Sequence, residues 1–175
     1  MKELIDMMRE RRSVREYTGE EIAEEALEKI LQAGLLSASG KGKRPFEFIV
    51  VKDRSALKYL SDCRVGSAKM LEGASCAIAV IADSLISDTI IEDSSIALAN
   101  MHLMADSLGL GSCWIQCRMR EATDKRSSEE YVRDKLKFPE NYKLEAILSI
   151  GIPKNKPKAH DMPDTASGKV HYEKF

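Results

Sequence analysis

Two segments near the start of the chain carry apolar residues at helical spacing. In "ELIDMMRERRSVR" an apolar stripe runs into a basic cluster, which predicts a short first helix. Thr18 and Glu21 then have the spacing of a capping box, and apolar residues continue at helical spacing from Ile22 to Leu31. A second helix is therefore expected over residues 20–34, followed by a loop in the small and basic residues "SASGKGKRP".

Short apolar runs bounded by polar residues predict the strands. They are "FEFIVV" (46–51), "CAIAVIA" (76–82), residues 113–115, and "LEAILSIGI", which stops at Pro153. Helices are expected between them, one capped by Asp53, one closed by Gly109 and one in "SSEEYVRDKL". The helix before Gly109 offers the following residues to a core: Ile96, Ala97, Asn100, Met101, Leu103, Met104 and Leu108. We predict one α+β or α/β domain, with helices packed on a single sheet.

The length and charge of the chain argue against several classes of function. The chain has 175 residues, of which 43% are hydrophobic and 31% charged, and this is typical of one soluble globular domain. Its formal net charge of −1 gives no general attraction to nucleic acid or to a membrane surface. No apolar run approaches the ~20 residues that span a bilayer, and the N-terminus lacks the pattern of a signal peptide. We therefore expect a cytoplasmic protein without a nucleic-acid or membrane partner.

The cysteines and histidines do not predict a metal site. The cysteines form neither a CxxC pair nor the disulfide framework of a small secreted domain. The histidines lie at no ligand spacing relative to them. Reduced, mostly buried thiols are expected at Cys63, Cys76, Cys113 and Cys117.

Basic residues gather at four places along a chain that is otherwise nearly neutral. In "RRSVR", Arg11, Arg12 and Arg15 surround Ser13, and arginine forks beside a hydroxyl suit a phosphate monoester. The loop "SGKGKR" resembles loops that present backbone amides to anions, but it lacks the spacing of a nucleoside triphosphate loop. The other basic positions are Lys69, Lys154, Lys156 and Lys158. Solvated surface charge is the alternative interpretation, but the clustering favours a phosphorylated small ligand such as a cofactor.

Five segments of the chain, taken in order, resemble the FMN-dependent nitroreductase family. They are "RRSVREY", "SASGKGKRPFEFIVV", "KMLEGASCAIAVIA", "ANMHLMADSLGLGSCWI" and "SGKVHYEKF". The resemblance covers nearly the whole chain, which is similar to the short members of the family. It implies an α+β sandwich in which helices flank a central, mainly antiparallel sheet. It also implies an intertwined homodimer that holds two FMN molecules in its interface.

The resemblance assigns the basic N-terminal motif and three further segments to FMN. Arg11, Arg12, Ser13 and Arg15 match the motif that holds the phosphate, the ribityl chain and the pyrimidine edge of the flavin. Lys69 matches a lysine directed at the flavin N1 and O2 edge, where a cation stabilises the negative charge of the reduced ring. The segment that reaches the flavin from the partner subunit contains Ala38, Ser39 and Gly42. Many relatives have asparagine in the place of Gly42.

Two more segments complete the implied site. The stretch Trp114, Ile115, Gln116 and Cys117 matches one whose backbone N–H groups approach flavin N5 and O4, although many relatives have a proline and then a glutamate-glycine pair there. In the tail, Lys158 matches a phosphate-binding lysine, and His160 stands where arginine is common. The tail of residues 154–175 is expected to extend along the partner subunit. Its end alternates apolar and polar residues, as a strand added to a sheet edge does.

The implied activity is oxidoreduction at the flavin. NAD(P)H delivers hydride to flavin N5 and leaves, and then a nitroaromatic, a quinone or another flat acceptor is reduced in the same site by a ping-pong mechanism. No side chain is assigned as an acid or base; Lys69 and Arg15 are expected to raise the flavin potential. The alternatives are a flavoprotein of the same fold with dehydrogenation or dehalogenation chemistry, and a dimer that stores or senses FMN without catalysis. Nucleic-acid binding by the basic arm is disfavoured by the net charge.

Overall fold

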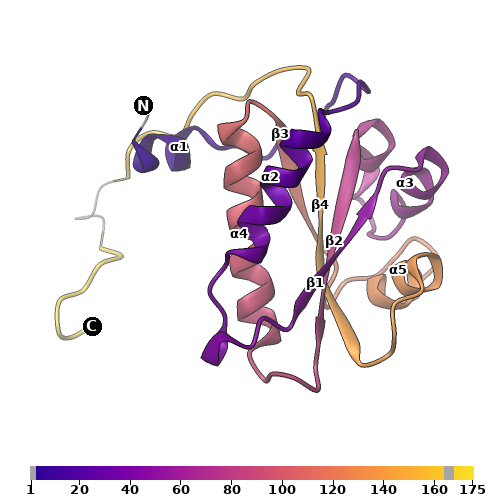
Figure 1. The fold of residues 1–175 in the computed structure, drawn as a ribbon. Coiled ribbons are helices and arrows are strands. Elements are labelled where there is room, and N and C mark those ends of the chain that lie inside the picture. The colour runs from indigo at the N-terminus through magenta and orange to yellow at the C-terminus, as the bar shows by residue number, and fades with distance from the viewer. Residues whose placement is uncertain (1–2, 164–167) are drawn as a thin grey trace.

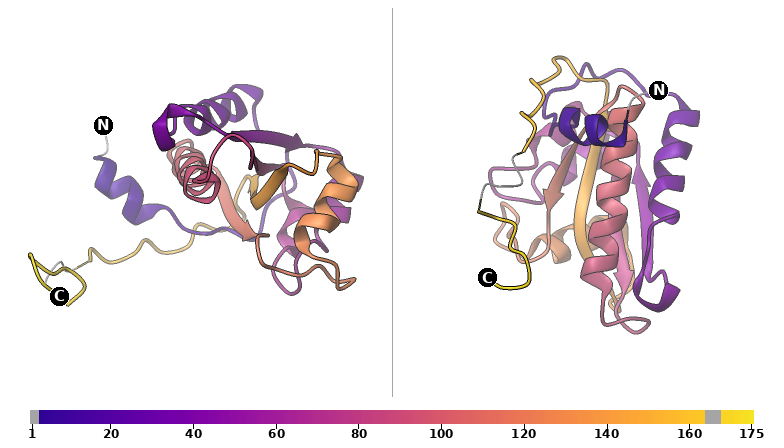
Figure 2. Two further views of the ribbon diagram at one scale, coloured as in Figure 1. Left: turned by 90° about the horizontal axis from the view of Figure 1, so that it is seen from below. Right: turned by 90° about the vertical axis from the view of Figure 1, so that its left-hand side faces the viewer.

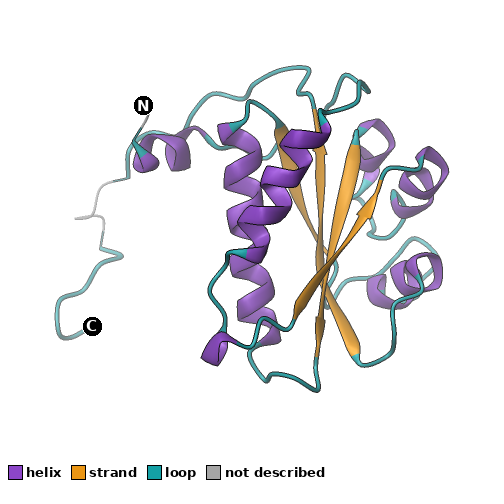
Figure 3. Ribbon diagram, viewed as in Figure 1, coloured by secondary structure: helices purple, strands orange, loops and turns teal. Residues whose placement is uncertain are grey.

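A four-stranded antiparallel sheet forms the centre of the protein. The computed structural model describes residues 3–163 and 168–175. The strands are β1 (Phe46–Val51), β2 (Cys76–Asp83), β3 (Gly111–Gln116) and β4 (Tyr142–Gly151), in the order β1-β2-β4-β3. All four lie where the apolar runs predict them (Figures 1 and 3). The predicted α+β class with an antiparallel sheet is therefore confirmed.

Helices cover both faces of the sheet. On one face lie α2 (Glu24–Leu35) and α4 (Ile90–Ser107), and on the other α3 (Arg54–Leu60) and α5 (Ser128–Leu136), as the view from below in Figure 2 shows. Strand β2 contributes Ile78 and Val80 to the first core and Ala77, Ala79 and Ile81 to the second. Burial on both faces explains why this strand is a continuous apolar run rather than an alternating one.

The short elements lie at the edges of this sandwich. Helix α1 (Leu4–Glu10) packs beside α4 and has no buried residue. Two 3-10 turns, η1 (Gly40–Gly42) and η2 (Lys69–Gly73), connect α2 to β1 and α3 to β2. Among the described residues, no helix combines the length and apolar character needed to cross a membrane. All four cysteines are buried, as predicted.

The predicted capping signals are confirmed at two helices and wrong at one, and the structure adds a capping box at a fourth helix. Asp53 accepts a hydrogen bond from the Ala56 backbone N–H at 2.8 Å, and Gly109 follows α4 with a φ of 77°. Ser127 and Glu130 form a capping box at the start of α5. At α2, however, the predicted cap at Thr18 is wrong, because the helix begins at Glu24.

Tertiary hydrogen bonds explain the late start of α2. The Thr18 backbone N–H donates to the Ile152 carbonyl at 2.9 Å, just beyond β4. The Ile22 backbone N–H donates to Ser75 Oγ at 2.9 Å, immediately before β2. These contacts hold residues 18–22 in a non-helical path along the ends of two strands. The backbone N–H groups of Thr18 and Ile22 therefore have hydrogen-bond acceptors at the ends of these strands and not within a helix.

The core prediction for α4 is also only partly right. Ala97, Met101 and other residues are buried, but Ile96 is 41% exposed and Asn100 is exposed too, because both lie on the face of α4 directed away from the sheet. The sequence predicts a C-terminal tail that ends in a strand added to a sheet edge. Residues 168–175 form no strand within this chain. The rest of the tail prediction includes residues 164–167, which lie outside the described residues.

Candidate functional site

The basic arm of residues 11–15 lies along the outer edge of β3. Ser13 forms an isolated parallel bridge with Ser112, and the Val14 N–H donates to the Ser112 carbonyl at 2.9 Å. Gly111 permits this close approach, since a Cβ atom there would lie 2.7 Å from Val14 Cγ1. The arm therefore occupies the edge that β4 leaves free.

A histidine that no sequence motif connects with the arm orients Arg11. Arg11 Nη1 lies 2.7 Å from His102 Nε2, and His102 Nδ1 lies 2.5 Å from Ser112 Oγ. Because arginine only donates, Nε2 must accept, and the ring proton on Nδ1 points to Ser112. Burial and, secondarily, the charge of Arg11 lower the pKa of His102 from 6.5 to about 4. A neutral imidazole thus holds one of the five donors of Arg11 and leaves the others available.

Positive charge converges on Cys113, the third residue of β3. Burial raises the pKa of this thiol, whereas the charges of Arg15, Arg64 and Arg11 and a hydrogen bond with Ser13 lower it. Arg64, from the loop after α3, belongs to no predicted motif. Three guanidinium groups, two from the arm and one from a distant loop, therefore place a positive field at the start of β3.

The C-terminal tail runs back beside the arm. The Arg12 guanidinium donates to the Lys158 carbonyl, and the His160 N–H donates to the Arg9 carbonyl at 3.0 Å. Figure 1 shows this tail passing α1 on its way from β4. The structure therefore brings the predicted tail residues Lys158 and His160 to the predicted phosphate-binding motif.

Main-chain donors at the far end of β3 divide into two sets. The Cys117 N–H donates to the Glu145 carbonyl at 3.2 Å, and the Ser112 carbonyl faces the arm. Because N–H groups alternate in direction along an antiparallel edge strand, Trp114 and Gln116 point their N–H groups outward and Ile115 points toward β4. Of the predicted stretch 114–117, only Trp114 and Gln116 can therefore offer main-chain donors to a ligand.

A hydrogen-bonded chain of side chains supports this end of β3. The Trp114 indole Nε1 donates to Gln116 Oε1 at 2.8 Å, and Gln116 Nε2 donates to Glu145 Oε1 at 3.0 Å. The Glu145 carbonyl also accepts from the Arg118 N–H at 3.0 Å. Glu145 thus holds the turn that follows β3. No motif signals this role, since the residue lies within an apolar strand sequence.

Lys69 lies in η2 and is paired with acidic side chains. Its Nζ is 2.9 Å from Asp62 Oδ1 and 3.4 Å from Glu72 Oε1, and its side chain is 66% exposed. The hydrogen bond to Asp62 is the main cause of its raised pKa. These ion pairs neutralise part of the positive charge of Lys69 that the resemblance directs at the flavin N1 and O2 edge.

The predicted segment Ala38–Gly42 does not meet the arm within one chain. The Gly40 N–H donates to Asp93 Oδ1 at 2.8 Å, near the start of α4, whereas Arg11 contacts His102 near the other end of that helix. Nine helical residues separate these two contacts by about 13 Å, and Figure 1 shows η1 and the arm at opposite ends of α4. Gly42 has a φ of 68°, a conformation that asparagine tolerates better than most residues.

Comparisons with known proteins agree with this architecture. The model of the nitroreductase family matches residues 8–68 and 60–152. A protein of Archaeoglobus fulgidus named "Putative NADH dehydrogenase/NAD(P)H nitroreductase" is 36% identical over 180 residues, with all of both chains covered. The structure of an FMN-dependent nitroreductase from Clostridium difficile R20291 is 45% identical with a TM-score of 0.93, covering 98% of this chain and 99% of that chain.

A more distant structure shares the fold. The NADPH:FMN oxidoreductase of Vibrio harveyi, solved in complex with NAD+, is 23% identical with a TM-score of 0.81 and covers 98% of this chain and 77% of that chain. The family model and the A. fulgidus relative together cover the whole sandwich, including the basic arm and β3. The chain belongs to the nitroreductase family.

Proposed function

We propose that the protein is an FMN-dependent oxidoreductase of the cytoplasm that takes electrons from NAD(P)H and reduces nitroaromatic compounds, quinones or similar flat acceptors. The observation that carries the proposal is the group of arginines along the free edge of β3, next to outward-facing main-chain donors. The C. difficile structure with 45% identity is an FMN-dependent nitroreductase, and the A. fulgidus relative is named for NAD(P)H. Both names support the choice of cofactor and electron donor.

The donor set of the arm fits a phosphate monoester. Arg11 and Arg12 each use one donor within the chain, so further N–H groups remain for phosphate oxygens. Ser13 adds a hydroxyl, and Lys158 adds an exposed ammonium on the neighbouring tail. Because His102 is neutral, the guanidinium of Arg11 carries the only charge of the Arg11–His102 pair. These residues are proposed to hold the phosphate, the ribityl chain and the pyrimidine edge of FMN.

The remaining residues would hold and tune the ring. The bound flavin supplies hydride transfer at its N5 atom. The outward N–H groups of Trp114 and Gln116 are proposed to bind the acceptor atoms along the N5 and O4 edge. Arg15 and Arg64, whose charges act on Cys113, would stabilise the negative charge that a bound flavin gains on reduction. Lys69 contributes less than the sequence predicts, because Asp62 and Glu72 compete for its ammonium.

A second copy of the chain is proposed to complete the site. Helix α1 and the tail expose Ile5, Met8 and Met162 around a groove of about 450 Å³, and Tyr172 is 85% exposed. Such apolar exposure is typical of a surface that becomes buried in an assembly. The segment Ala38–Gly42 would reach the flavin of the partner subunit, and the tail of residues 154–175 would pack on it.

We expect a homodimer at micromolar concentration, and Met8→Glu should shift it toward the monomer and reduce FMN retention. Burying an unpaired carboxylate in an apolar interface costs several kcal/mol. Light scattering after size-exclusion chromatography measures the mass. Met119→Glu, which adds the same charge at an exposed apolar residue on the α5 side, is the matched control. A wild-type protein that runs as a monomer and retains FMN would contradict the proposal.

The visible spectrum tests the proposed function directly. The purified protein should show a flavin band that bleaches on anaerobic addition of NADH or NADPH and returns when a quinone is added. Double-reciprocal plots for donor and acceptor should be parallel, as a ping-pong mechanism requires. A colourless protein that takes up no FMN would refute flavin binding. A bound flavin that neither nicotinamide reduces within catalytic times would favour storage or sensing instead.

A further inference from the structure

The loop between α2 and β1 carries cations that the proposed FMN site does not use. This basic loop, residues 39–44, contains Lys41, Lys43 and Arg44, and all three are exposed. Lys43 Nζ donates to the Ile86 carbonyl at 2.6 Å. Within the described part of the chain, no hydrogen bond or ion pair engages the Lys41 ammonium or the Arg44 guanidinium. The basic loop therefore presents two cations that are free to bind an anion.

The backbone of the basic loop is strained at these two residues. Lys41 has a φ of 54° and Arg44 a φ of 47°, in the left-handed region that residues with a side chain rarely adopt. Strained residues of this kind persist only where the surrounding structure determines their conformation, and they cluster at active sites and ligand contacts. Glycine would relieve the strain at both positions. The choice of two cations in its place points to a role in binding.

Hydrogen bonds fix the basic loop to the start of α4. The Gly40 N–H donates to Asp93 Oδ1 at 2.8 Å, and the Arg44 N–H donates to Ser39 Oγ at 2.9 Å. Asp93 is 3% exposed. A Cβ atom at Gly40 would collide with Thr89 Oγ1, so the loop approaches the helix at a position that only glycine permits. The backbone that carries the two cations is thus in place before a ligand arrives, which lowers the entropic cost of binding.

Exposed apolar side chains lie next to these cations. The Asp83 N–H donates to the Pro45 carbonyl at 2.9 Å, and Lys43 bonds the Ile86 carbonyl, so the turn after β2 lies beside the basic loop. On this turn Leu85 is 82% exposed and Ile86 is 45% exposed. Cations beside an apolar surface fit a ligand in which an anionic group lies close to a flat ring.

One substrate of the proposed reaction has this combination of groups. Nitro and quinone groups are uncharged, whereas NADPH carries a phosphate on the ribose that bears its adenine ring. The pyrophosphate, which NADH also contains, lies on the far side of that ribose. The segment Ala38–Gly42, which includes Lys41, is proposed to reach the flavin of the partner subunit. The basic loop would then lie beside the place where the electron donor meets that flavin.

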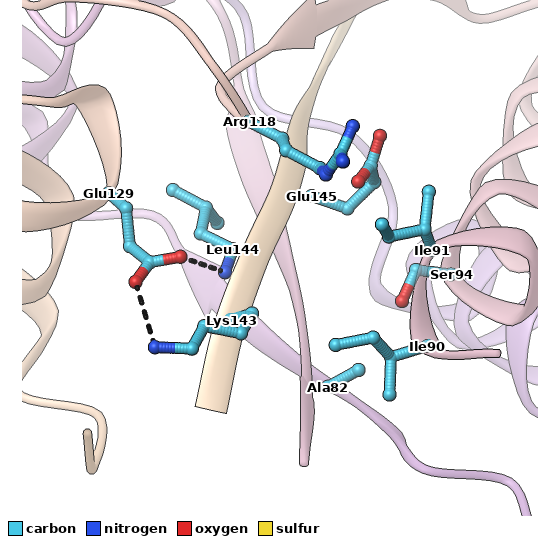
Figure 4. A pocket seen from close by; sticks show the side chains of 9 residues that line it. All are labelled: Ala82, Ile90, Ile91, Ser94, Arg118, Glu129, Lys143, Leu144 and Glu145. Atoms are coloured by element: carbon cyan, nitrogen blue, oxygen red, sulfur yellow. Dashed lines mark hydrogen bonds and ion pairs between the residues drawn. The ribbon is translucent and has the colours of Figure 1, made fainter. Parts of the chain in front are cut away.

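Another pair of exposed cations suits a phosphate less well. Arg118 and Lys143 line a cavity of about 150 Å³ between α4 and β4 (Figure 4). Lys143 Nζ lies 3.7 Å from Glu129 Oε1. Figure 4 shows the Arg118 side chain directed toward Glu145, whose Oε2 accepts no hydrogen bond within the described residues. Two carboxylates therefore accompany these cations and would repel a phosphate dianion.

We propose that Lys41 and Arg44 bind the 2′-phosphate of NADPH, so that the protein prefers NADPH to NADH as its electron donor. The adenine ring packs against Leu85 and Ile86. This inference rests on the proposed function, because it names the donor that the same flavin site uses.

Nucleotide binding to the FMN-loaded protein tests the proposal without turnover. Isothermal titration calorimetry compares adenosine 2′,5′-bisphosphate with 5′-AMP, which differ only in the 2′-phosphate. Wild type should bind the bisphosphate at least about 10-fold more tightly. This factor corresponds to about 1.4 kcal/mol, near the lower end of what one hydrogen bond to a charged group contributes.

The variant Lys41→Gly/Arg44→Gly should lose this preference. Glycine adopts a positive φ without strain, so the variant removes both cations and keeps the path of the loop. Lys125→Gly is the matched control, since Lys125 is also an exposed lysine with a positive φ, of 70°, but lies in the loop before α5. It should keep the wild-type preference. In the enzyme assay, the ratio of kcat/KM for NADPH to that for NADH should fall at least about 10-fold in the double variant only.

Three results would overturn the proposal. The first is an unchanged preference in the double variant. The second is an equal loss of affinity for both nucleotides, because it would place the cations on the 5′-phosphate, which belongs to the pyrophosphate of NADH as well. The third is a flavin-loaded wild-type protein that binds both nucleotides equally, which would refute this inference alone. A protein without a flavin band would refute the proposed function together with it.

Discussion

Replacing Arg11 with alanine is expected to weaken FMN binding by about 10- to 100-fold, since a hydrogen bond to a charged group contributes about 1.5–3 kcal/mol. His102 Nε2 holds the guanidinium at 2.7 Å, and Ser112 in turn holds His102. The charge is therefore positioned before the ligand arrives, and little side-chain entropy remains to be lost on binding. Quenching of free FMN fluorescence during titration of the apoprotein measures the dissociation constant.

Arg120→Ala provides the control for this prediction. Arg120 is exposed, and its guanidinium donates to the carbonyl of the neighbouring Met119, so the variant removes the same charge away from the arm. Its FMN affinity should stay within about twofold of wild type, because its exposed guanidinium is bonded to a neighbouring carbonyl and does not belong to the group proposed to hold the phosphate. Equal losses in both variants would indicate a general effect of net charge and not a phosphate contact.

The free energy of unfolding is expected to fall by about 3 kcal/mol between pH 7 and pH 4 because of His102 alone. Its pKa is lowered from 6.5 to about 4 in the folded protein, mainly by burial. Between these values the unfolded chain binds a proton that the folded chain excludes. The contribution of the neutral imidazole is complete above pH 6.5 and is lost progressively as the pH falls toward 4.

Urea unfolding at a series of pH values tests this effect. His102→Gln removes the titrating group, so its stability should vary less with pH than that of wild type over this window. Parallel curves for wild type and His102→Gln would mean that His102 is solvated or protonated in the folded protein. Arg11 would then have lost its acceptor.

The tertiary structure changes the predicted site in identifiable ways. Lys69 is paired with Asp62 and Glu72, although the family resemblance directs its ammonium at the flavin N1 and O2 edge. Ile115 and Cys117 direct their N–H groups toward β4, which leaves Trp114 and Gln116 as the outward donors. Neither result follows from spacing along the chain, because each depends on which segment lies alongside.

Local signals in the amino-acid sequence account for the strands, most of the helix ends and the chemical character of the arm. Alternating and continuous apolar runs predict all four strands, and Asp53 and Gly109 mark helix ends, because each of these signals depends on residues within a few positions. The cluster "RRSVR" already indicates an anion site for the same reason. The failure at Thr18 shows the limit of such signals, since contacts with Ile152 and Ser75 outweigh a local cap.

Which charged side chains lie next to one another depends on the folding of distant segments onto each other. His102 reaches Arg11 across 91 positions, and Arg64 joins Arg15 over Cys113 from a different loop. The direction of the Glu145 side chain depends on one skipped residue between β2 and β4, and a one-residue change of register moves a side chain to the other face of a strand. Burial then sets the protonation of His102 and leaves one oxygen of Glu145 without a partner. Desolvation and strand register are properties of the packed chain, and no short motif encodes them.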